Sequence, residues 1–395
     1  MSLPRRDWDT IVVGLGGIGS GALYWLAREL RGDVLGLEQF DLGHDRGASQ
    51  DWSRIIRYSY HRPHYVRLAR QAYEAWRVVE EDSGESLVAT VGGLDLFPEG
   101  CAIPLEDYTS SLDAEGVSYE LIGAREIAHR WPAFRLEPGV LGLFQAEGGL
   151  VRAALANATH ARLAREYGAE VRERHEVEGV GSARGEIDVL AGGKRYRCGK
   201  LVIAGGAWSN ELLSHLGVEL PLTVTQEQVV YWQPVDPEPL REGRFPIWIW
   251  MDDPSFYGFP YLDEAGLKVG QDVGGREVTA RSRTFEPDTD ALERTRAFVE
   301  RVIPGGAGEV RSIKTCLYTL TPDRDFVIDG ARSEGGEGCF VAIGAGHAFK
   351  FASAIGRILA DLAQRGAAQE GVDLEPFRID RPVLQEKDPK RSFLV

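Results

Sequence analysis

The start of the chain alternates short apolar runs with a segment of helical periodicity. Residues 11–13 and 34–37 are two such runs, each bounded by polar or glycine positions. Between them, residues 22–30 carry apolar side chains at intervals of three and four. This spacing predicts a helix with one buried face, and the runs predict buried strands. Strand, helix and strand in this order are typical of a βαβ unit with parallel strands.

The same kind of apolar run recurs much later in the chain. Residues 201–204 and 339–343 are short apolar runs, and each leads into a glycine-rich turn. Residues 351–365 then have helical spacing. We expect these segments to join the first βαβ unit in one domain, although more than a hundred residues separate them.

Residues 229–270 have a different character. They are rich in Trp, Tyr and Phe and show alternating runs, which are typical of antiparallel strands. The expected fold class is therefore α/β, with a Rossmann-like dinucleotide-binding domain and a second, mainly antiparallel β-sheet domain for the substrate. We expect the first domain to be discontinuous and the second to be inserted into it. The predicted bounds are 1–85, 150–215 and 320–395 for the first domain, and 86–149 and 216–319 for the second.

Composition excludes several classes of partner. The chain has 395 residues, which is too long for one ordinary core, and a net charge of −15. So acidic a chain disfavours nucleic acids and anionic membranes as partners, and no apolar run approaches membrane-spanning length. The four cysteines show no CxxC spacing, so neither a zinc site nor a disulfide framework is expected. The polar residues 1–9 lead straight into a strand, so we expect no signal peptide and a cytoplasmic location.

The first predicted strand ends in a glycine loop. Gly14, Gly16 and Gly19 fit the pattern G-x-G-x-x-G, with a strand before it and a helix after it. In this setting the loop lets the backbone approach a pyrophosphate at the helix N-terminus. Glu38, at the end of the second strand, is suited to accept hydrogen bonds from the adenosine ribose and to repel a 2′-phosphate. The loop alone does not distinguish FAD from NAD.

Four further blocks follow the glycine loop. They are Ser53-Arg54-Ile55-Ile56-Arg57, then Tyr257-Gly258-Phe259-Pro260 with Lys268 beyond it, then Cys316-Leu317-Tyr318-Thr319 leading to Pro322-Asp323, and finally Gly346-His347-Ala348-Phe349-Lys350-Phe351. With these blocks in this order, nearly the whole chain resembles the monomeric sarcosine oxidase and N-methyltryptophan oxidase family. That family belongs to the wider group of D-amino-acid-oxidase-like flavoproteins.

The resemblance implies that FAD is the cofactor and that its 8α-methyl group is bonded to Cys316. Taken by itself, Cys316 is better interpreted as a buried, unreactive thiol. The glycine loop and the resemblance together give one set of expected cofactor-binding residues: Gly14, Gly16, Gly19, Glu38, Ser53, Arg54, Val177, Gly205, Cys316, Gly344, Gly346 and Lys350.

The resemblance also implies a set of catalytic residues. Arg57 and Lys350 are expected to hold the substrate carboxylate, since a guanidinium binds it bidentately and an ammonium adds a point charge. Lys268 is expected to activate oxygen over the flavin; the alternative is an exposed strand lysine. Arg57 has the alternative of a surface ion pair. The other expected catalytic residues are Arg54 and His347 beside the flavin, and Tyr257 and Tyr318 in the substrate cavity, with structural roles as the alternative for the histidine and the tyrosines.

The implied activity is FAD-dependent oxidation of the C–N bond of a secondary α-amino acid, N-methyl or cyclic, with O2 reduced to H2O2. The expected partners are therefore a small amino acid and O2, and the expected state is a monomer or a weak homo-oligomer. Three alternatives stay open: an FAD-dependent dehydrogenase that passes electrons to a quinone or protein, a non-catalytic FAD-binding redox sensor, and an NAD-dependent dehydrogenase. No metal is expected, because Pro63 separates His61 from His64 and no third ligand accompanies them.

Two departures from the family pattern bear on the substrate. Sarcosine-oxidising members carry His-Gly-Asp-Thr-Arg where this chain has Gln50-Asp51-Trp52-Ser53-Arg54. They also carry a histidine where this chain has Asp272, which we expect either to attract a cationic group of the substrate or to neutralise Lys268. The nearby aromatic residues offer a surface for a ring, with core packing as the alternative; they are Trp248, Trp250, Phe256 and Tyr257. We therefore expect a substrate larger than sarcosine.

Overall fold

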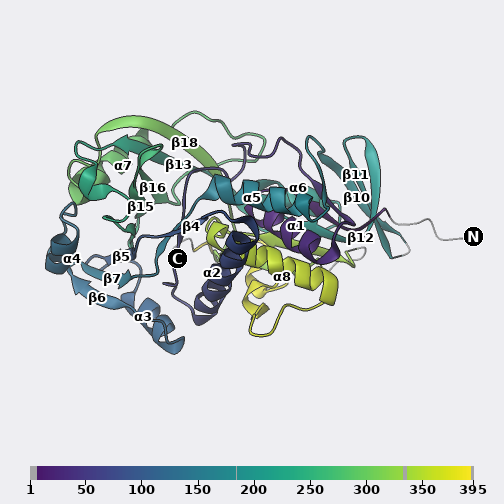
Figure 1. The fold of residues 1–395 in the computed structure, drawn as a ribbon, viewed down its shortest axis with the longest axis horizontal. Helices are drawn as coiled ribbons and strands as arrows, with labels where there is room; N and C mark the ends of the chain where they lie inside the picture. Colours follow the sequence, from purple (N-terminus) through teal and green to yellow (C-terminus); the bar gives the residue numbers. More distant parts are fainter. Residues whose placement is uncertain (1–6, 184, 332–335, 393–395) are drawn as a thin grey trace, which may run out of the picture.

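The computed structural model describes residues 7–183, 185–331 and 336–392. Its strands form an eight-stranded sheet, a nine-stranded sheet and a small three-stranded sheet. Figure 1 shows the eight-stranded sheet with its helices at one end of the elongated molecule and the nine-stranded sheet at the other. The predicted class, α/β with a second, mainly antiparallel sheet, is confirmed.

The eight-stranded sheet has a parallel centre. β1 pairs in parallel with β2 on one side and β12 on the other, and β12 pairs in parallel with β20. All four strands occur where the apolar runs predict them. The strands of this sheet are β1 (Trp8–Val13), β2 (Val34–Leu37), β9 (Glu170–Arg172), β10 (Val177–Ala183), β11 (Glu186–Ala191), β12 (Lys194–Ile203), β19 (Val327–Gly330) and β20 (Cys339–Ile343).

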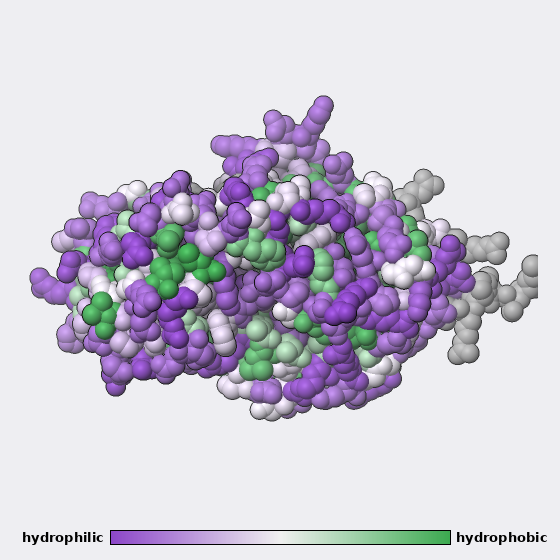
Figure 2. Space-filling model, turned by 90° about the horizontal axis from the view of Figure 1, so that it is seen from above, coloured by the Kyte–Doolittle hydropathy of each residue, from purple (hydrophilic) through white to green (hydrophobic). Residues whose placement is uncertain are grey.

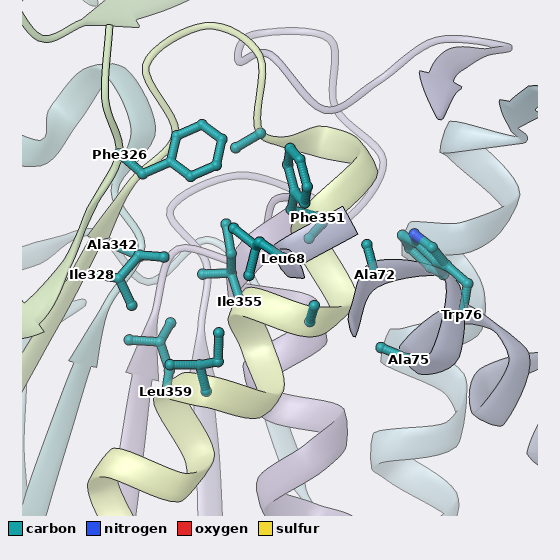
Figure 3. Packing of buried hydrophobic residues seen from close by; sticks show 14 of the residues in the cluster. Leu68, Ala72, Ala75, Trp76, Phe326, Ile328, Ala342, Phe351, Ile355 and Leu359 are labelled. Atoms are coloured by element: carbon teal, nitrogen blue, oxygen red, sulfur yellow. The ribbon is translucent and has the colours of Figure 1, made fainter. Parts of the chain in front are cut away.

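Helices α1 (Gly17–Leu30) and α8 (Ala352–Arg365) pack closely on this sheet. The two helices also cross each other. A Cβ atom at Gly356 of α8 would lie 2.4 Å from the backbone of Gly21 of α1, so the close approach of the helices requires glycine there. Figure 3 shows Ile355 and Leu359 of α8 pointing toward Ile328 and Ala342 of the sheet. The other helices of this part of the chain are α2 (Pro63–Ser83), α5 (Ala153–Glu166) and α6 (Ser209–Ser214).

The nine-stranded sheet is antiparallel except where β5 runs parallel to β14. Its strands are β5 (Gly93–Phe97), β6 (Glu120–Gly123), β7 (Leu141–Gln145), β13 (Thr223–Gln233), β14 (Ile247–Trp250), β15 (Ser255–Leu262), β16 (Gly266–Asp272), β17 (Arg276–Glu277) and β18 (Glu309–Leu320). The accompanying helices are α3 (Leu105–Ala114), α4 (Ala124–Arg130) and α7 (Thr289–Val302).

The small sheet is not expected from the sequence. In it, β3 (Arg54–Ile56) and β4 (Val88–Thr90) both pair with β8 (Gly149–Val151). These strands have only three residues each, which is too short for hydrophobic periodicity to register. The domain bounds proposed from the sequence remain a prediction.

The face of the molecule in Figure 2 is mostly hydrophilic, with small, separate hydrophobic patches. Patches of this kind are normal for protein surfaces. Within the described part of the chain, no helix has both the length and the apolar character needed to span a membrane.

Candidate functional site

A cavity of about 940 Å³ runs from the glycine loop to the nine-stranded sheet. It brings together residues that lie more than three hundred positions apart in the chain. Fourteen of the residues expected from the sequence line it: Gly14, Gly16, Glu38, Arg54, Arg57, Val177, Gly205, Tyr257, Cys316, Tyr318, Gly344, Gly346, His347 and Lys350. Three expected residues do not line it: Gly19, Ser53 and Lys268.

The glycine loop has the close contacts that its sequence predicts. Gly14 has a φ of +82°, and a Cβ atom there would lie 2.6 Å from the carbonyl oxygen of Ala204. A Cβ atom at Gly19 would lie 1.8 Å from the carbonyl oxygen of Gly14. Gly19 therefore serves the packing of α1 against the loop, while Gly14 and Gly16 face the cavity. The N-terminal end of α1 is thus open to a phosphate-bearing ligand.

Glu38 fixes the loop from the neighbouring strand. Its Oε2 accepts a hydrogen bond of 2.8 Å from the backbone of Leu15, and its Oε1 accepts one of 3.1 Å from Phe40. Each carboxylate oxygen keeps a lone pair for a further donor, such as a ribose hydroxyl. The residues present thus fit an adenine dinucleotide such as FAD.

Cys316 lies on β18 at the far wall of the cavity and is buried. Burial raises the pKa of its thiol to about 11, although nearby Arg54 lowers it. The thiol is therefore protonated at neutral pH. Its place in the same cavity as the glycine loop is what a covalent link to a dinucleotide cofactor requires.

Arg57 is buried and forms an ion pair, with its Nη1 2.5 Å from Oδ1 of Asp95. The other oxygen of Asp95 accepts a hydrogen bond from Ser59. The Nε atom of Arg57 is buried and has no hydrogen-bond partner among the residues that the structure describes. The alternative of a surface ion pair is therefore wrong, and Arg57 keeps a buried donor near the cavity that it lines.

Lys350 also lines the cavity and is buried in the 3₁₀ turn before α8. Its Nζ lies 2.9 Å from the hydroxyl of Tyr60 and 3.1 Å from the carbonyl oxygen of His347. Burial and the charge of Arg57 lower the pKa of this ammonium to about 7. An incoming carboxylate would favour the charged form.

His347 is a neutral member of the same group. Its Nε2 lies 2.9 Å from the carbonyl oxygen of Arg324, which only accepts, so Nε2 carries the proton. Its Nδ1 then accepts, and it lies 3.4 Å from the hydroxyl of Tyr60. Burial and the charges of Arg324 and Lys350 lower the pKa of the imidazole well below its usual value.

Asp272 does not contact Lys268. Its carboxylate lies 3.3 Å from the guanidinium of Arg324, which is completely buried. Both residues line the cavity. The expectation that Asp272 neutralises Lys268 is therefore wrong, because a cation from another segment already pairs with it. Asp272 still presents a charge to the substrate side.

Lys268 pairs with Asp51 instead. Its Nζ lies 2.7 Å from Oδ2 of Asp51 and donates a hydrogen bond of 2.7 Å to the carbonyl oxygen of Ser53. Only 2% of Lys268 is exposed, so the alternative of an exposed strand lysine is wrong. Oδ2 of Asp51 also lies 3.0 Å from Nη1 of Arg54. Asp51 and Arg54 line the cavity, whereas Lys268 lies behind them in the protein interior and does not line it.

The aromatic residues divide into two groups. Tyr257 and Tyr318 line the cavity, and Phe259 lines it beside them. A Cβ atom at Gly346 would lie 2.6 Å from the ring of Tyr318, so this glycine makes room for that ring. The other expected aromatic residues, Trp248, Trp250 and Phe256, pack against Phe298 in the core and do not line the cavity.

Several cavity residues are absent from the sequence prediction: Asp51, Tyr60, Lys314 and Arg324. Asp95, the buried partner of Arg57, is absent from it as well. Asp95 has one usable signal, since a lone carboxylate inside the apolar strand Gly93–Phe97 requires a buried partner. No group of three potential metal ligands occurs among the residues that the structure describes.

Comparisons with known proteins agree with this arrangement. The family described as FAD dependent oxidoreductase matches residues 9–362. A monomeric sarcosine oxidase of Streptomyces avermitilis is 35% identical over 94% of this chain and 98% of its own length. The N-methyl-L-tryptophan oxidase of Yersinia pestis is 28% identical over 95% of this chain and 99% of its own. The structure of NikD, described as an unusual amino acid oxidase, aligns with a TM-score of 0.84 at 26% identity over 95% and 98% of the two chains. The chain therefore belongs to the FAD-dependent oxidoreductase family.

Proposed function

We propose that this protein oxidises the C–N bond of a secondary α-amino acid, N-methyl or cyclic, and uses O2 as the electron acceptor. The observation that carries the proposal is the pair of buried cations, Arg57 and Lys350, in the cavity that begins at the glycine loop. FAD, when bound, supplies the acceptor for a hydride equivalent, that is two electrons and one proton, from the substrate carbon. The protein supplies position and charge.

Arg57 and Lys350 bind the substrate carboxylate in this proposal. The cavity offers the unpartnered Nε of Arg57 and the ammonium of Lys350, which is anchored by the hydroxyl of Tyr60. Arg57 is balanced by Asp95 and Arg324 by Asp272, whereas no carboxylate of the described residues lies within salt-bridge distance of Lys350. One added carboxylate therefore balances the charge of the pocket.

The amine of the substrate binds in its neutral form. His347 is held as a neutral imidazole with its proton on Nε2, facing a carbonyl. The basic nitrogen, Nδ1, lies 3.4 Å from the hydroxyl of Tyr60, and the lowered pKa makes the imidazole a weak base, so it does not serve to remove a proton from the amine. Tyr257, Tyr318 and Phe259 give the rest of the wall an apolar character and exclude water from the reacting carbon.

Two further roles belong to the same proposal. Cys316 bonds covalently to the 8α-methyl group of FAD, as its place in the cavity supports. Lys268 promotes the reaction of oxygen, since its ammonium is a buried cation surrounded by cavity residues. We place the enzyme in the cytoplasm as a monomer or weak homo-oligomer. Cys101, Cys198 and Cys339, which form no disulfide and are not part of the proposed flavin link, support a reducing compartment.

The substrate is larger than sarcosine in this proposal. Asp272 places a carboxylate at the cavity wall, where it favours a hydrogen-bond donor on the substrate. Trp248, Trp250 and Phe256 lie in the core and cannot contact a substrate. The aromatic contact with the substrate therefore comes from Tyr257 and Tyr318.

A dehydrogenase is the second candidate. The ammonium of Lys268 is paired with Asp51 and does not line the cavity, which favours weak reactivity with oxygen. A screen that couples peroxide formation to a dye separates the two candidates. N-methyl amino acids, proline and pipecolate should give peroxide in proportion to substrate consumed. Turnover only with an added quinone would support the dehydrogenase, and no turnover with any acceptor would contradict both.

A further inference from the structure

Asp51 is surrounded by cations and donors. Its Oδ2 contacts Lys268 at 2.7 Å and Arg54 at 3.0 Å. Its Oδ1 contacts the ammonium of Lys314 at 3.3 Å and accepts a hydrogen bond from the hydroxyl of Tyr231. The side chain is 3% exposed. One buried carboxylate thus forms ion pairs with three cations from three segments of the chain.

The backbone of Asp51 is in an unfavourable conformation. Its φ is +130°, a region that favours glycine. The family motif quoted above carries glycine at this position. The backbone is nevertheless fixed, because the carbonyl oxygen of Asp51 accepts a hydrogen bond of 2.9 Å from Ala154, at the start of α5. A strained aspartate at a glycine position persists only where its side chain contributes more than the strain costs.

The surroundings of Lys268 show what the side chain of Asp51 contributes. Its ammonium faces the ring of Phe259 at 4.5 Å and is otherwise buried. The titratable or charged groups around it come from each neighbouring element: Asp51 and Arg54 from the segment at β3, Tyr231 from β13, Tyr257 from β15, and Lys314 and Cys316 from β18. Asp51 is the carboxylate in direct contact with this ammonium.

Burial lowers the pKa of Lys268, Asp51 raises it and Arg54 lowers it, and the pKa that results is about 8. Burial also raises the pKa of Asp51, but Lys268 and Arg54 together hold it well below its usual value. Asp51 is therefore ionised whenever Lys268 is charged. Without that charge, burial and Arg54 would both act to discharge Lys268.

We propose that Asp51 is a positioning residue: its carboxylate fixes Lys268 beside the flavin site and keeps the amine charged there. The proposal rests on the proposed function only for the role of Lys268 toward oxygen; the charge coupling itself is independent of any substrate. It also gives a reason for aspartate at a position whose φ of +130° favours glycine. The negative charge of Asp51 raises the pH at which the ammonium of Lys268 loses its proton.

The test is a pH titration of the visible absorption spectrum of the FAD-bound protein, because a flavin spectrum responds to a charge close to the ring. Lys268→Met identifies the transition that belongs to Lys268. The test variants are Asp51→Asn and Asp51→Gly, the second of which suits the positive φ. Asp82→Asn is the matched control, since Asp82 also accepts from an arginine and two tyrosines but does not line the cavity.

Wild-type protein and Asp82→Asn should show one transition near pH 8, which Lys268→Met lacks. Both Asp51 variants should move its midpoint down by about 1–3 pH units, since an opposite charge at contact distance shifts a pKa by that amount. Reoxidation of photoreduced enzyme by O2 should show the same shift without any substrate. An unchanged or raised midpoint in Asp51→Gly would overturn the proposal, as would a wild-type spectrum without a transition that depends on Lys268. A failed substrate screen with the expected shift would instead count against the proposed function alone.

Discussion

Arg57 and Asp95 form a buried ion pair, with 2.5 Å between Nη1 and Oδ1. β3 ends one residue before Arg57, and Asp95 lies in the middle of β5, so the pair ties the small sheet region to the nine-stranded sheet. This arrangement gives Arg57 two tasks. It keeps Asp95 from being an uncompensated buried charge, and it keeps a buried, unpartnered Nε donor while lining the cavity.

A double variant distinguishes the contribution of Arg57 to stability from its contribution to substrate binding. Arg57→Gln leaves Asp95 unpaired, so the free energy of unfolding should fall by about 3–5 kcal/mol. The same change should lower kcat/KM by about 10- to 100-fold, because a charge-assisted hydrogen bond contributes about 1.5–3 kcal/mol. Adding Asp95→Asn should restore much of the stability but not the activity. Denaturant unfolding and steady-state kinetics measure both; recovery of activity along with stability would show that Arg57 is only structural.

The pKa of Lys350 predicts how carboxylate binding depends on pH. Burial lowers this pKa to about 7, so the ammonium that attracts a carboxylate is lost from the free enzyme as pH rises above 7. The affinity for a simple carboxylate such as acetate should therefore fall between pH 7 and 9. Perturbation of the flavin spectrum measures the binding. Lys350→Met should bind weakly at all pH values, and a wild-type affinity that is constant over this range would contradict the assignment.

Lys350 also affects stability in a defined direction. Its folded pKa of about 7 lies below its ordinary value of 10.5. Between these two pH values the unfolded chain binds more protons than the folded chain, so this residue makes the protein more stable as pH rises. Below pH 7 the cost of burying the charged amine is fully present. Lys350→Met should therefore raise the melting temperature more at pH 6 than at pH 9, and an equal effect at both would argue against a buried ammonium.

Cys316 is expected to carry the flavin. Acid precipitation of the wild-type protein should leave the yellow colour in the pellet, whereas Cys316→Ser should release it to the supernatant. Cys198→Ser is the matched control, since Cys198 is also buried but lies on β12 away from the cavity. Colour found wholly in the supernatant of the wild-type protein would exclude a covalent link.

The sequence predicts the glycine loop and its neighbouring strands well, because local spacing carries their signal. Gly14 and Gly19 stand in a strand–loop–helix setting, and their predicted close contacts are present. The periodicity at residues 351–365 likewise gives α8 almost to its ends. In these segments each residue's role depends on its near neighbours in the chain.

The charge partners of the site are not predictable in this way. The pairs Arg57–Asp95, Asp272–Arg324 and Asp51–Lys268 span 38, 52 and 217 positions of the chain, so no local spacing identifies them. The sequence suggests Asp272 as a partner of Lys268 because it follows that lysine by only four positions, where the family pattern has a histidine. In the structure Lys268 pairs with Asp51 and Asp272 pairs with Arg324. These partners come from other segments, and folding brings them together.

Lys268 should affect reoxidation more than substrate oxidation. A unit charge about 4 Å from developing negative charge contributes up to about 4 kcal/mol at an effective dielectric near 20. Lys268→Met should therefore slow the reaction of the reduced enzyme with O2 by tenfold or more, while anaerobic reduction by substrate changes much less. Stopped-flow absorbance measures the two half-reactions separately. Equal slowing of both would indicate that Lys268 is structural.

The central claim is that a carboxylate-anchored secondary amine is oxidised in this cavity. The most direct measurement is the anaerobic loss of visible flavin absorption after mixing with matched pairs of amines: proline and pyrrolidine, and pipecolate and piperidine. The account predicts that at least one carboxylate-bearing member reduces the flavin, and that its partner without the carboxylate does so at least about tenfold more slowly, in line with a loss of 1.4 kcal/mol or more. Equal rates within each pair, or no reduction by these compounds or by any N-methyl amino acid, would contradict it.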